Sequence, residues 1–364
     1  MPAKTPIPIE LIHLVIRFLD DSKSTLASCA LVCRSWVPIS RFIFFRHIDL
    51  STTVEPFLKL LESPYQTVST ARVESLTVTH SRYAPALFNR LLTWRSSDNH
   101  RTLSTALPSL KRLTLNKVGW WTLSGEAKDQ LLNEFLTITH LKLTMTAFDT
   151  YDDFLPLINS FPSLEQLDLD TVRPALHWEP TVPLDSVELP RNLHRISLRQ
   201  IDDCQIIAFL APCPNLETLH CRFIDFDAVS PECTSAICKL LRSSGESLLS
   251  FGLEVERYQV DGARDDTALD LSKNPNLGYL CLSPYHILPT LKSFVRCREP
   301  PGFTSLCLPR FDELDWESLD LLLSRDLAFK HLQEIHLEDR VLGKGELDLE
   351  ALMPRCGEKG LLRG

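Results

Sequence analysis

The sequence contains no apolar stretch of the roughly 18 residues that a membrane-spanning helix needs. The longest early apolar segment, Leu11 to Leu19, is interrupted by His13 and Arg17. The chain does not open with the charged, apolar and small-residue order of a secretory signal, and it has no Asn-x-Ser/Thr sequon. These absences favour a protein of the cytoplasm or the nucleus.

The sequence also lacks a Cys-x-x-Cys pair, although it has 11 cysteines. An odd number of scattered cysteines without a signal sequence predicts reduced thiols. Cys29 and Cys33 lie four residues apart on an apolar helical stretch. Because a free cysteine behaves as a small apolar side chain, core packing is favoured there over metal binding.

Catalytic motifs are absent as well. The sequence has no Gly-x-Ser-x-Gly, His-Glu-x-x-His, phosphate-loop or Gly-x-Gly-x-x-Gly pattern. The net charge of −9 makes nucleic acid a poor partner, because binding phosphates requires a basic surface. We therefore predict no catalytic residue, no metal, no cofactor and no membrane partner, and we expect a protein-binding function.

The first 48 residues predict short helices. The first ends at residues 20–22, the second runs from Lys23 to Trp36 and ends before Pro38, and a third spans Ile39 to Phe45. Apolar residues cover more than one face of each helix. Because so short a segment cannot bury enough surface alone, one face is expected to pack internally and another to contact a partner.

A known motif matches this segment. Its elements are Ile7-Pro8-Ile9-Glu10-Leu11-Ile12, Val15-Ile16-x-Phe18-Leu19-Asp20, Leu26, and Ala30-Leu31-Val32-Cys33-Arg34-Ser35-Trp36. The segment resembles the F-box family, whose opening is usually Leu-Pro-x-Glu and whose second helix commonly reads Leu-Val-Cys-Arg-x-Trp. Ile7 stands in place of the usual Leu and keeps the apolar contact.

The resemblance implies binding to the Skp adaptor, which joins F-box proteins to a cullin–RING ubiquitin ligase. By analogy, the adaptor contacts would include Ile7, Pro8, Leu11, Val15, Leu19, Leu31, Val32 and Trp36. The alternative is a helical cap that seals the first repeat of the body.

The body repeats a pattern of the form Leu-x-x-Leu-x-Leu. The eleven hexads end at Leu50, Val78, Leu115, Leu143, Leu169, Leu198, Cys221, Leu253, Leu282, Leu308 and Leu337. Their spacing of mostly 23 to 32 residues suits leucine-rich repeats. Each hexad predicts a short half-buried strand, with helices between them at Ala86–Trp94, Lys128–Leu136, Asp153–Asn159, Cys233–Leu241, Leu288–Val295 and Trp316–Leu323.

Strand and helix at a regular period predict parallel strands with helices outside them. The expected fold class is α/β: F-box helices over residues 1–48, an irregular leucine-rich-repeat solenoid over 49–345, and a C-terminal cap and tail over 346–364. Irregularity is expected because the usual Asn is missing three residues after the hexad, where Val118, Val172 and Ile201 occur. The combination resembles the fungal-type F-box leucine-rich-repeat family.

Charged side chains on the predicted concave side suggest where a protein substrate would bind. They are Asp168, Asp170, Arg195, Arg199, His220 and Arg222. The basic group could hold an acidic or phosphorylated peptide. The alternative is that Arg195 and Arg199 pair with Asp168 and Asp170 on the neighbouring strand.

The resulting hypothesis is a substrate-recognition subunit of an SCF-type ligase, without chemistry of its own. One alternative is a Skp-bound interaction scaffold that acts outside a ligase. The other is an enzyme whose site is assembled only by folding.

Overall fold

The computed structural model describes residues 8–363 except 21, 52, 64–67, 69–72, 81–84, 175–187, 202, 226–229, 258–267, 297–301, 312–313 and 342–347. The chain forms two compact units. The first comprises residues 1–148 with 160–163, and the second comprises residues 149–159 with 164–364.

The first unit begins with three short helices, referred to below as the head. They are α1 (Ile9–Arg17), α2 (Lys23–Val32) and α3 (Val37–Phe44). Both α1 and α2 pack against α3. The core of the head consists of Ile16, Leu26, Ile39 and Ile43. The predicted helical opening is therefore confirmed.

Three details of the head prediction were wrong. The second helix ends at Val32 rather than Trp36, because the backbone of Cys33 is extended with φ −160° and ψ 163°. Pro38 lies in the first turn of α3, where a proline needs no N–H partner, instead of stopping α2. Cys29 is buried as expected, but Cys33 is exposed, so it does not pack in the core.

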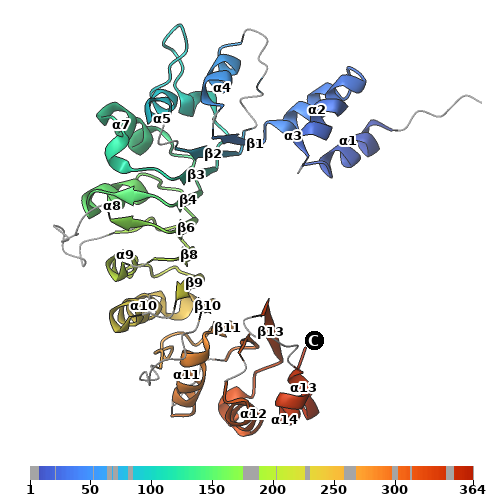
Figure 1. Cartoon of the computed structure of the whole chain (residues 1–364), viewed down its shortest axis with the longest axis vertical. Coiled ribbons are helices and arrows are strands. Elements are labelled where there is room, and N and C mark those ends of the chain that lie inside the picture. The colour runs from blue at the N-terminus through green and yellow to red at the C-terminus, as the bar shows by residue number, and fades with distance from the viewer. Residues whose placement is uncertain are drawn as a thin grey trace, which may run out of the picture. The chain divides into compact units, whose positions relative to one another are not determined.

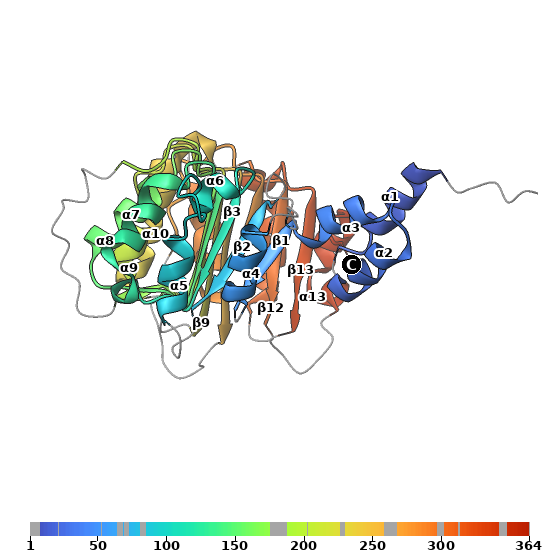
Figure 2. The same cartoon turned by 90° about the horizontal axis from the view of Figure 1, so that it is seen from above.

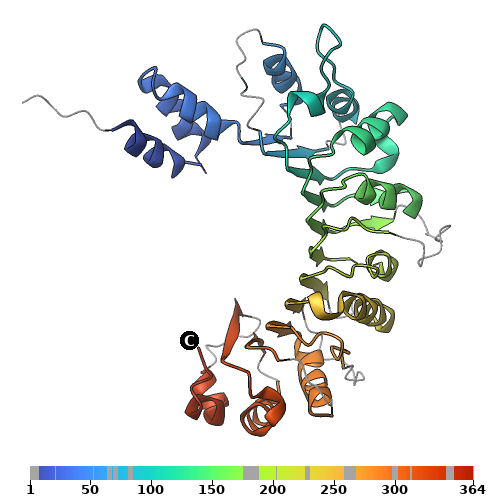
Figure 3. The same cartoon turned by 180° about the vertical axis from the view of Figure 1, so that it is seen from behind.

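Strands of the first unit follow the head and run parallel in the order β1-β2-β3-β4. They are β1 (His47–Leu50), β2 (Ser75–Thr79), β3 (Arg112–Asn116) and β4 (His140–Thr144), with the short β5 at Ala147–Phe148. The helices are α4 (Val54–Leu61), α5 (Pro85–Leu92), α6 (Leu103–Ala106) and α7 (Gly125–Glu134), with a 3₁₀ turn at Trp120–Thr122. Helices α5 and α7 lie on one side of these strands (Figure 3).

The second unit repeats the same arrangement in the order β6-β8-β9-β10-β11-β12-β13. The strands are β6 (Gln166–Asp170), β8 (Arg195–Arg199), β9 (Thr218–Asp225), β10 (Ser250–Arg257), β11 (Tyr279–Leu282), β12 (Ser305–Arg310) and β13 (Glu334–Val341), with the short β7 at Arg173–Pro174. The helices are α8 (Tyr151–Asn159), α9 (Cys204–Phe209), α10 (Pro231–Ser244), α11 (Pro284–Arg296), α12 (Trp316–Arg325), α13 (Leu349–Leu352) and α14 (Pro354–Glu358). In Figure 2, α9 and α10 lie on one side of β9.

The predicted repeat is confirmed at the level of a mixed α/β fold with parallel strands. Each of the eleven hexads ends in a strand of one of the two units, and each of the six expected helices overlaps an observed one. Helices α4, α6 and α9 were not predicted. The two units divide the chain inside the repeats, and the boundaries at 48 and 345 stay predictions.

The apolar positions of each hexad point toward the helices and form the core. In β3 and β4, Leu113, Leu115, Leu141 and Leu143 are all buried, while the residues between them are partly exposed. Burying a leucine side chain contributes on the order of 1.5–3 kcal/mol. Since each strand contributes two or three such side chains, the stacked leucines stabilise the repeat more than any polar contact does.

A left-handed residue follows several strands at the same place in the repeat. The residues are Lys117 (φ 59°), Met145 (φ 48°), Thr171 (φ 56°) and Gln200 (φ 52°). The N–H groups of Lys117, Thr171 and Gln200 each donate a 2.8 Å hydrogen bond to the next strand. The acceptors are, in the same order, the carbonyl oxygens of Thr144, Arg199 and Arg222.

This turn accounts for the missing asparagine. The next residue is buried in each case and is apolar at Val118, Val172 and Ile201. The fourth, Thr146, is polar, and its hydroxyl donates to the carbonyl oxygen of Leu115 over 3.3 Å. Backbone N–H groups at the turn therefore bridge neighbouring strands, in a repeat whose sequence lacks the asparagine ladder.

The left-handed turn predicts opposite effects for two substitutions of the exposed Met145. An L-residue in this conformation costs about 1 kcal/mol and glycine does not, so Met145→Gly should match or exceed the wild-type stability. Met145→Val should lower the free energy of unfolding by about 1–2 kcal/mol, because a β-branched side chain fits this backbone worst. Urea unfolding measures both; equal stability of the two variants would contradict the role given to the turn.

Candidate functional site

The head carries an apolar surface that no other part of the described chain covers. The side chains of Ile9, Leu11, Leu14 and Val15 on α1 are exposed, as is that of Phe18 at its C-terminal end, and on α2 those of Leu31 and Val32 are exposed. Phe18 is 81% exposed and Leu31 is 87% exposed. These seven residues are referred to below as the apolar head surface. Clustered exposure of large apolar side chains is typical of a protein-binding surface.

The structure divides the predicted adaptor contacts into three groups. Pro8, Leu11, Val15, Leu31 and Val32 are exposed. Leu19 and Trp36 are partly buried and pack against the head core, so they support the surface more than they extend it. Ile7 lies outside the described residues.

Leu14 and Phe18 belong to the same surface, although neither was named as an adaptor contact. The sequence signal was available, because residues 11, 14, 15 and 18 follow the helical spacing of three and four that places side chains on one face. The opposite face, with Ile12, Ile16 and Leu19, packs into the head. Helix α1 therefore has two apolar faces, and only one of them is used internally.

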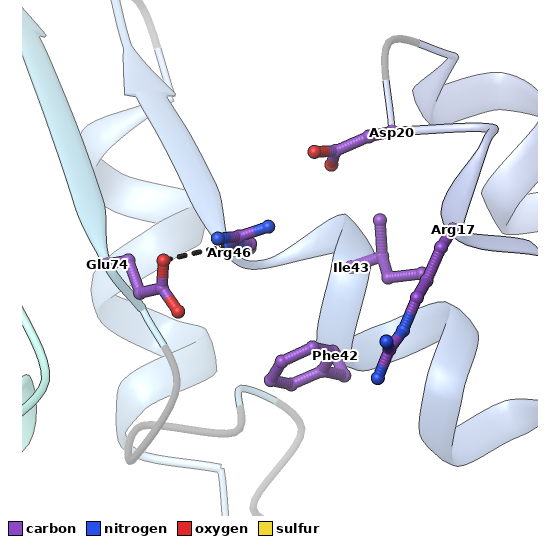
Figure 4. Close-up of a pocket in the computed structure, with 6 residues that line it drawn as sticks. All are labelled: Arg17, Asp20, Phe42, Ile43, Arg46 and Glu74. Carbon is purple, nitrogen blue, oxygen red and sulfur yellow. Dashed lines mark hydrogen bonds and ion pairs between the residues drawn. The ribbon is translucent and has the colours of Figure 1, made fainter. Parts of the chain in front are cut away.

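A pocket of about 280 Å³ lies where the head meets the first strands (Figure 4). Its walls are formed by Arg17, Asp20, Phe42, Ile43, Arg46 and Glu74. Nε of Arg46 donates to Oε2 of Glu74 over 2.9 Å, and Oδ2 of Asp20 lies 3.8 Å from Nε2 of His47. Oδ1 of Asp20 is buried and receives no hydrogen bond from the described residues. Positive and negative side chains balance one another here, which suits a junction better than a charged ligand site.

Further contacts join the head to the first strand. Nζ of Lys23, at the start of α2, donates to the carbonyl oxygen of His47 over 2.8 Å and lies 5.8 Å from the ring centre of Phe44. With the Arg46–Glu74 pair, these contacts attach the head to β1 and β2. The helices that carry the apolar head surface are therefore held against the first strands by these contacts.

The six predicted substrate-face residues lie on β6, β8 and β9 of the second unit, and most have partners within that sheet. Arg199 lies 3.9 Å from Asp170, and Arg222 lies 3.9 Å from Glu254. His220 and Glu254 are 2.7 Å apart. Arg222 is also almost fully buried, with 7% of its surface exposed. Several of these charged side chains are therefore paired within the sheet, as in the alternative that the sequence left open.

Arg195 differs from the other basic residues of this face. It is exposed, and its register neighbours are Gln166 on β6 and Thr218 on β9, so it does not face Asp168 directly. Asp168 accepts a 3.2 Å hydrogen bond from Gln166. Glu254, the acid that balances His220 and Arg222, was missed, although it directly follows its hexad as Asp170, Arg199 and Arg222 follow theirs, so the same sequence signal could have found it.

Ser283 and His286 form a buried serine–histidine pair. Oγ of Ser283 and Nδ1 of His286 are 2.7 Å apart, and each residue is 1% exposed. A substrate cannot reach this pair, so it belongs to the structure of α11. Within the described ranges, no group of three or more His, Cys, Asp or Glu side chains could hold a metal ion, and the described cysteines are free thiols. No described helix has the length and apolar character to cross a membrane.

Burial of His286 predicts a specific pH dependence of stability. Burial lowers the pKa of His286 to about 4 from 6.5, so the unfolded chain binds a proton more readily. The stabilising contribution is complete above pH 6.5 and is lost as the pH falls toward 4, by up to about 3 kcal/mol. Urea unfolding should show that the free energy of unfolding falls less between pH 7 and pH 4 in His286→Asn than in the wild type. The same fall in both proteins would contradict this prediction.

Comparison with known proteins finds no matching family model and no matching curated protein. Among solved structures, the chain is similar to the crystal structure of a TLR13–ssRNA13 complex, at 14% identity and a TM-score of 0.38. That match covers 81% of this chain and 40% of the other, so the chain spans about two fifths of the TLR13 length. It is also similar to the crystal structure of the APL1 leucine-rich repeat domain, at 14% identity and a TM-score of 0.27, covering 80% of this chain and 85% of that one. The description as a leucine-rich repeat fold rests on the strands and registers of the chain itself.

Proposed function

We propose that the protein is a substrate-recognition subunit of an SCF-type cullin–RING ubiquitin ligase. Its head would bind the Skp adaptor, and its repeats would bind a protein destined for ubiquitination. The observation that carries this proposal is the apolar head surface, which coincides with residues 9–32 of the F-box-like motif. The resemblance of that motif gives the partner its identity.

The energetics of the head support a docking role. A side chain of leucine size contributes about 1.5–3 kcal/mol when it is fully buried, and seven large apolar side chains are exposed on α1 and α2. A helical cap that only sealed the first repeat would turn such residues toward β1. Here the contacts with β1 and β2 come instead from Lys23, Arg46 and Asp20. The apolar head surface remains available to a partner.

The repeats supply the second half of the proposal. In each unit the helices cover one side of the strands (Figure 1 and Figure 2). The alternate, polar positions of the strands are partly exposed and lie on the other side, referred to below as the open face. Repeat proteins use such extended surfaces to bind other proteins. Arg195, exposed on the open face of the second unit, keeps a place in this proposal as a substrate contact, and the chain itself would carry out no covalent step.

The proposal predicts that one acid on the apolar head surface abolishes adaptor binding. Leu31→Asp should reduce capture of Skp in a pull-down by at least tenfold, because it places a charge in a desolvated contact. Folding should be unchanged, since the wild-type side chain is 87% exposed. Val15→Asp on α1 should act in the same way.

Leu327→Asp is the matched control. Leu327 is 83% exposed in the 3₁₀ turn Leu327–Phe329 of the second unit, so the chemical change and the exposure are nearly the same. It should capture Skp as the wild type does. Undiminished capture by Leu31→Asp and Val15→Asp would refute the adaptor role. Capture of Skp without cullin from cell extracts would refute membership of a ligase while leaving adaptor binding intact.

A further inference from the structure

Two cysteines lie side by side on the open face of the second unit. Cys281 on β11 and Cys307 on β12 are register partners in a parallel pair of strands. Each lies between two buried leucines of its own strand, so both side chains point away from the helices. Among the described strands, no other two cysteines are register partners; Cys221 on β9, for example, faces leucines on both sides.

Both thiols are buried, although most open-face positions of the other strands are partly exposed. Cys281 is 2% exposed and Cys307 is 4% exposed. Two rings lie over β12 at this place. Tyr279 on β11 and His336 on β13 come from the strands on either side of β12, and their ring centres are 6.0 Å apart. Because two strands on either side of a third are about 9.6 Å apart, the rings must lean toward each other across β12.

The hydroxyl group of Tyr279 fixes one of the thiols. A hydrogen bond joins the side chains of Tyr279 and Cys307. Burial, together with the neighbouring thiols of Cys281 and Cys307, raises the pKa of the Tyr279 hydroxyl above its usual 10. The hydroxyl therefore keeps its proton and remains a donor to the sulfur of Cys307. This bond holds Cys307 in place beneath the two rings and beside Cys281.

The spacing of the two residues suits a disulfide. The Cα atoms of bridged cysteines are usually about 4.4–6.8 Å apart, and neighbouring strands of a sheet are separated by about 4.8 Å. The strands of the second unit curve with the helices on the outer side (Figure 1). Such curvature brings the side chains of the open face closer together, which favours contact between the two sulfur atoms.

We propose that Cys281 and Cys307 are an oxidant-sensitive dithiol, which a peroxide converts into a disulfide between neighbouring repeats. One thiolate attacks an oxygen of hydrogen peroxide, the O–O bond breaks, and a sulfenic acid and a hydroxide ion form. The second thiolate attacks the sulfenic sulfur, the S–S bond forms, and a second hydroxide ion leaves. The two protons released by the thiols convert both hydroxide ions into water. Two thiols and one peroxide thus give one disulfide and two water molecules.

The burial of the pair selects the oxidant. Hydrogen peroxide is close to water in size and can reach a nearly covered sulfur, whereas oxidised glutathione must bring a peptide-sized group to it. The second thiol also determines the product, because it traps the sulfenic acid before further oxidation to sulfinic acid. The disulfide ties β11 to β12 and withdraws the Cys307 sulfur from Tyr279. This site is independent of the adaptor role proposed for the head.

The test treats the reduced full chain with hydrogen peroxide and, in parallel, with oxidised glutathione. Catalase ends the peroxide reaction, and N-ethylmaleimide in urea then blocks the remaining thiols before digestion with trypsin. Cys281 and Cys307 are released in residues 274–292 and 299–310, each of which contains one cysteine. We expect peroxide to link these two peptides with a loss of about 2 Da, in a form that dithiothreitol reverses. Oxidised glutathione should form the link at least about tenfold more slowly.

Cys213→Ala is the matched control, because Cys213 is also 2% exposed but lies outside the strands. It should form the linked peptides as the wild type does. Cys281→Ala should abolish the link and leave a sulfenic acid on Cys307 that dimedone labels, a product that shows the oxidant still reaches the site.

Three outcomes would overturn the proposal. They are the absence of the linked peptides from peroxide-treated wild type, links between other cysteines of the folded chain in equal amount, and loss of the link in Cys213→Ala. Skp capture should be unchanged in Cys281→Ala, so the result is independent of the adaptor test.

Discussion

Each strand of this protein buries apolar side chains that its own helix covers only in part. Leu113 and Leu115 on β3 are buried because β2 and β4 place equivalent residues beside them in register. The free energy of stacking is therefore shared between neighbours, as in other repeat proteins. The left-handed turns keep neighbouring strands together at the point where the chain leaves a strand. There the N–H group of the left-handed residue donates a hydrogen bond to the neighbouring strand.

The head depends on the repeat in a different way. Its own core is small, with four buried residues at its centre, and it is attached to β1 and β2 by polar contacts. A module of this size gains little stability alone. The apolar surface on α1 and α2 is therefore costly to leave in water, and a partner that covered it would stabilise the head as well as bind it.

The open faces of the two units carry different side chains. In the second unit, Glu254 and Asp170 lie close to the basic residues that the sequence indicated as a binding site, and this neutralises much of their field. In the first unit, Arg112 and Lys142 lie among threonine and serine hydroxyls.

The sequence alone determined the repeat and the helical head, because leucine spacing of three and two specifies which side of a strand is buried. It also singled out Leu11, Val15, Leu31 and Val32, whose side chains are exposed. It could not determine the end of α2, since the extended backbone of Cys33 leaves no periodic signal. Nor could it determine which cations are neutralised: Glu254 meets His220 and Arg222 only when β9 and β10 pair in register, and Lys142 meets Thr114 only through β3 and β4. Charge balance depends on neighbours across strands, and only the tertiary structure decides those neighbours.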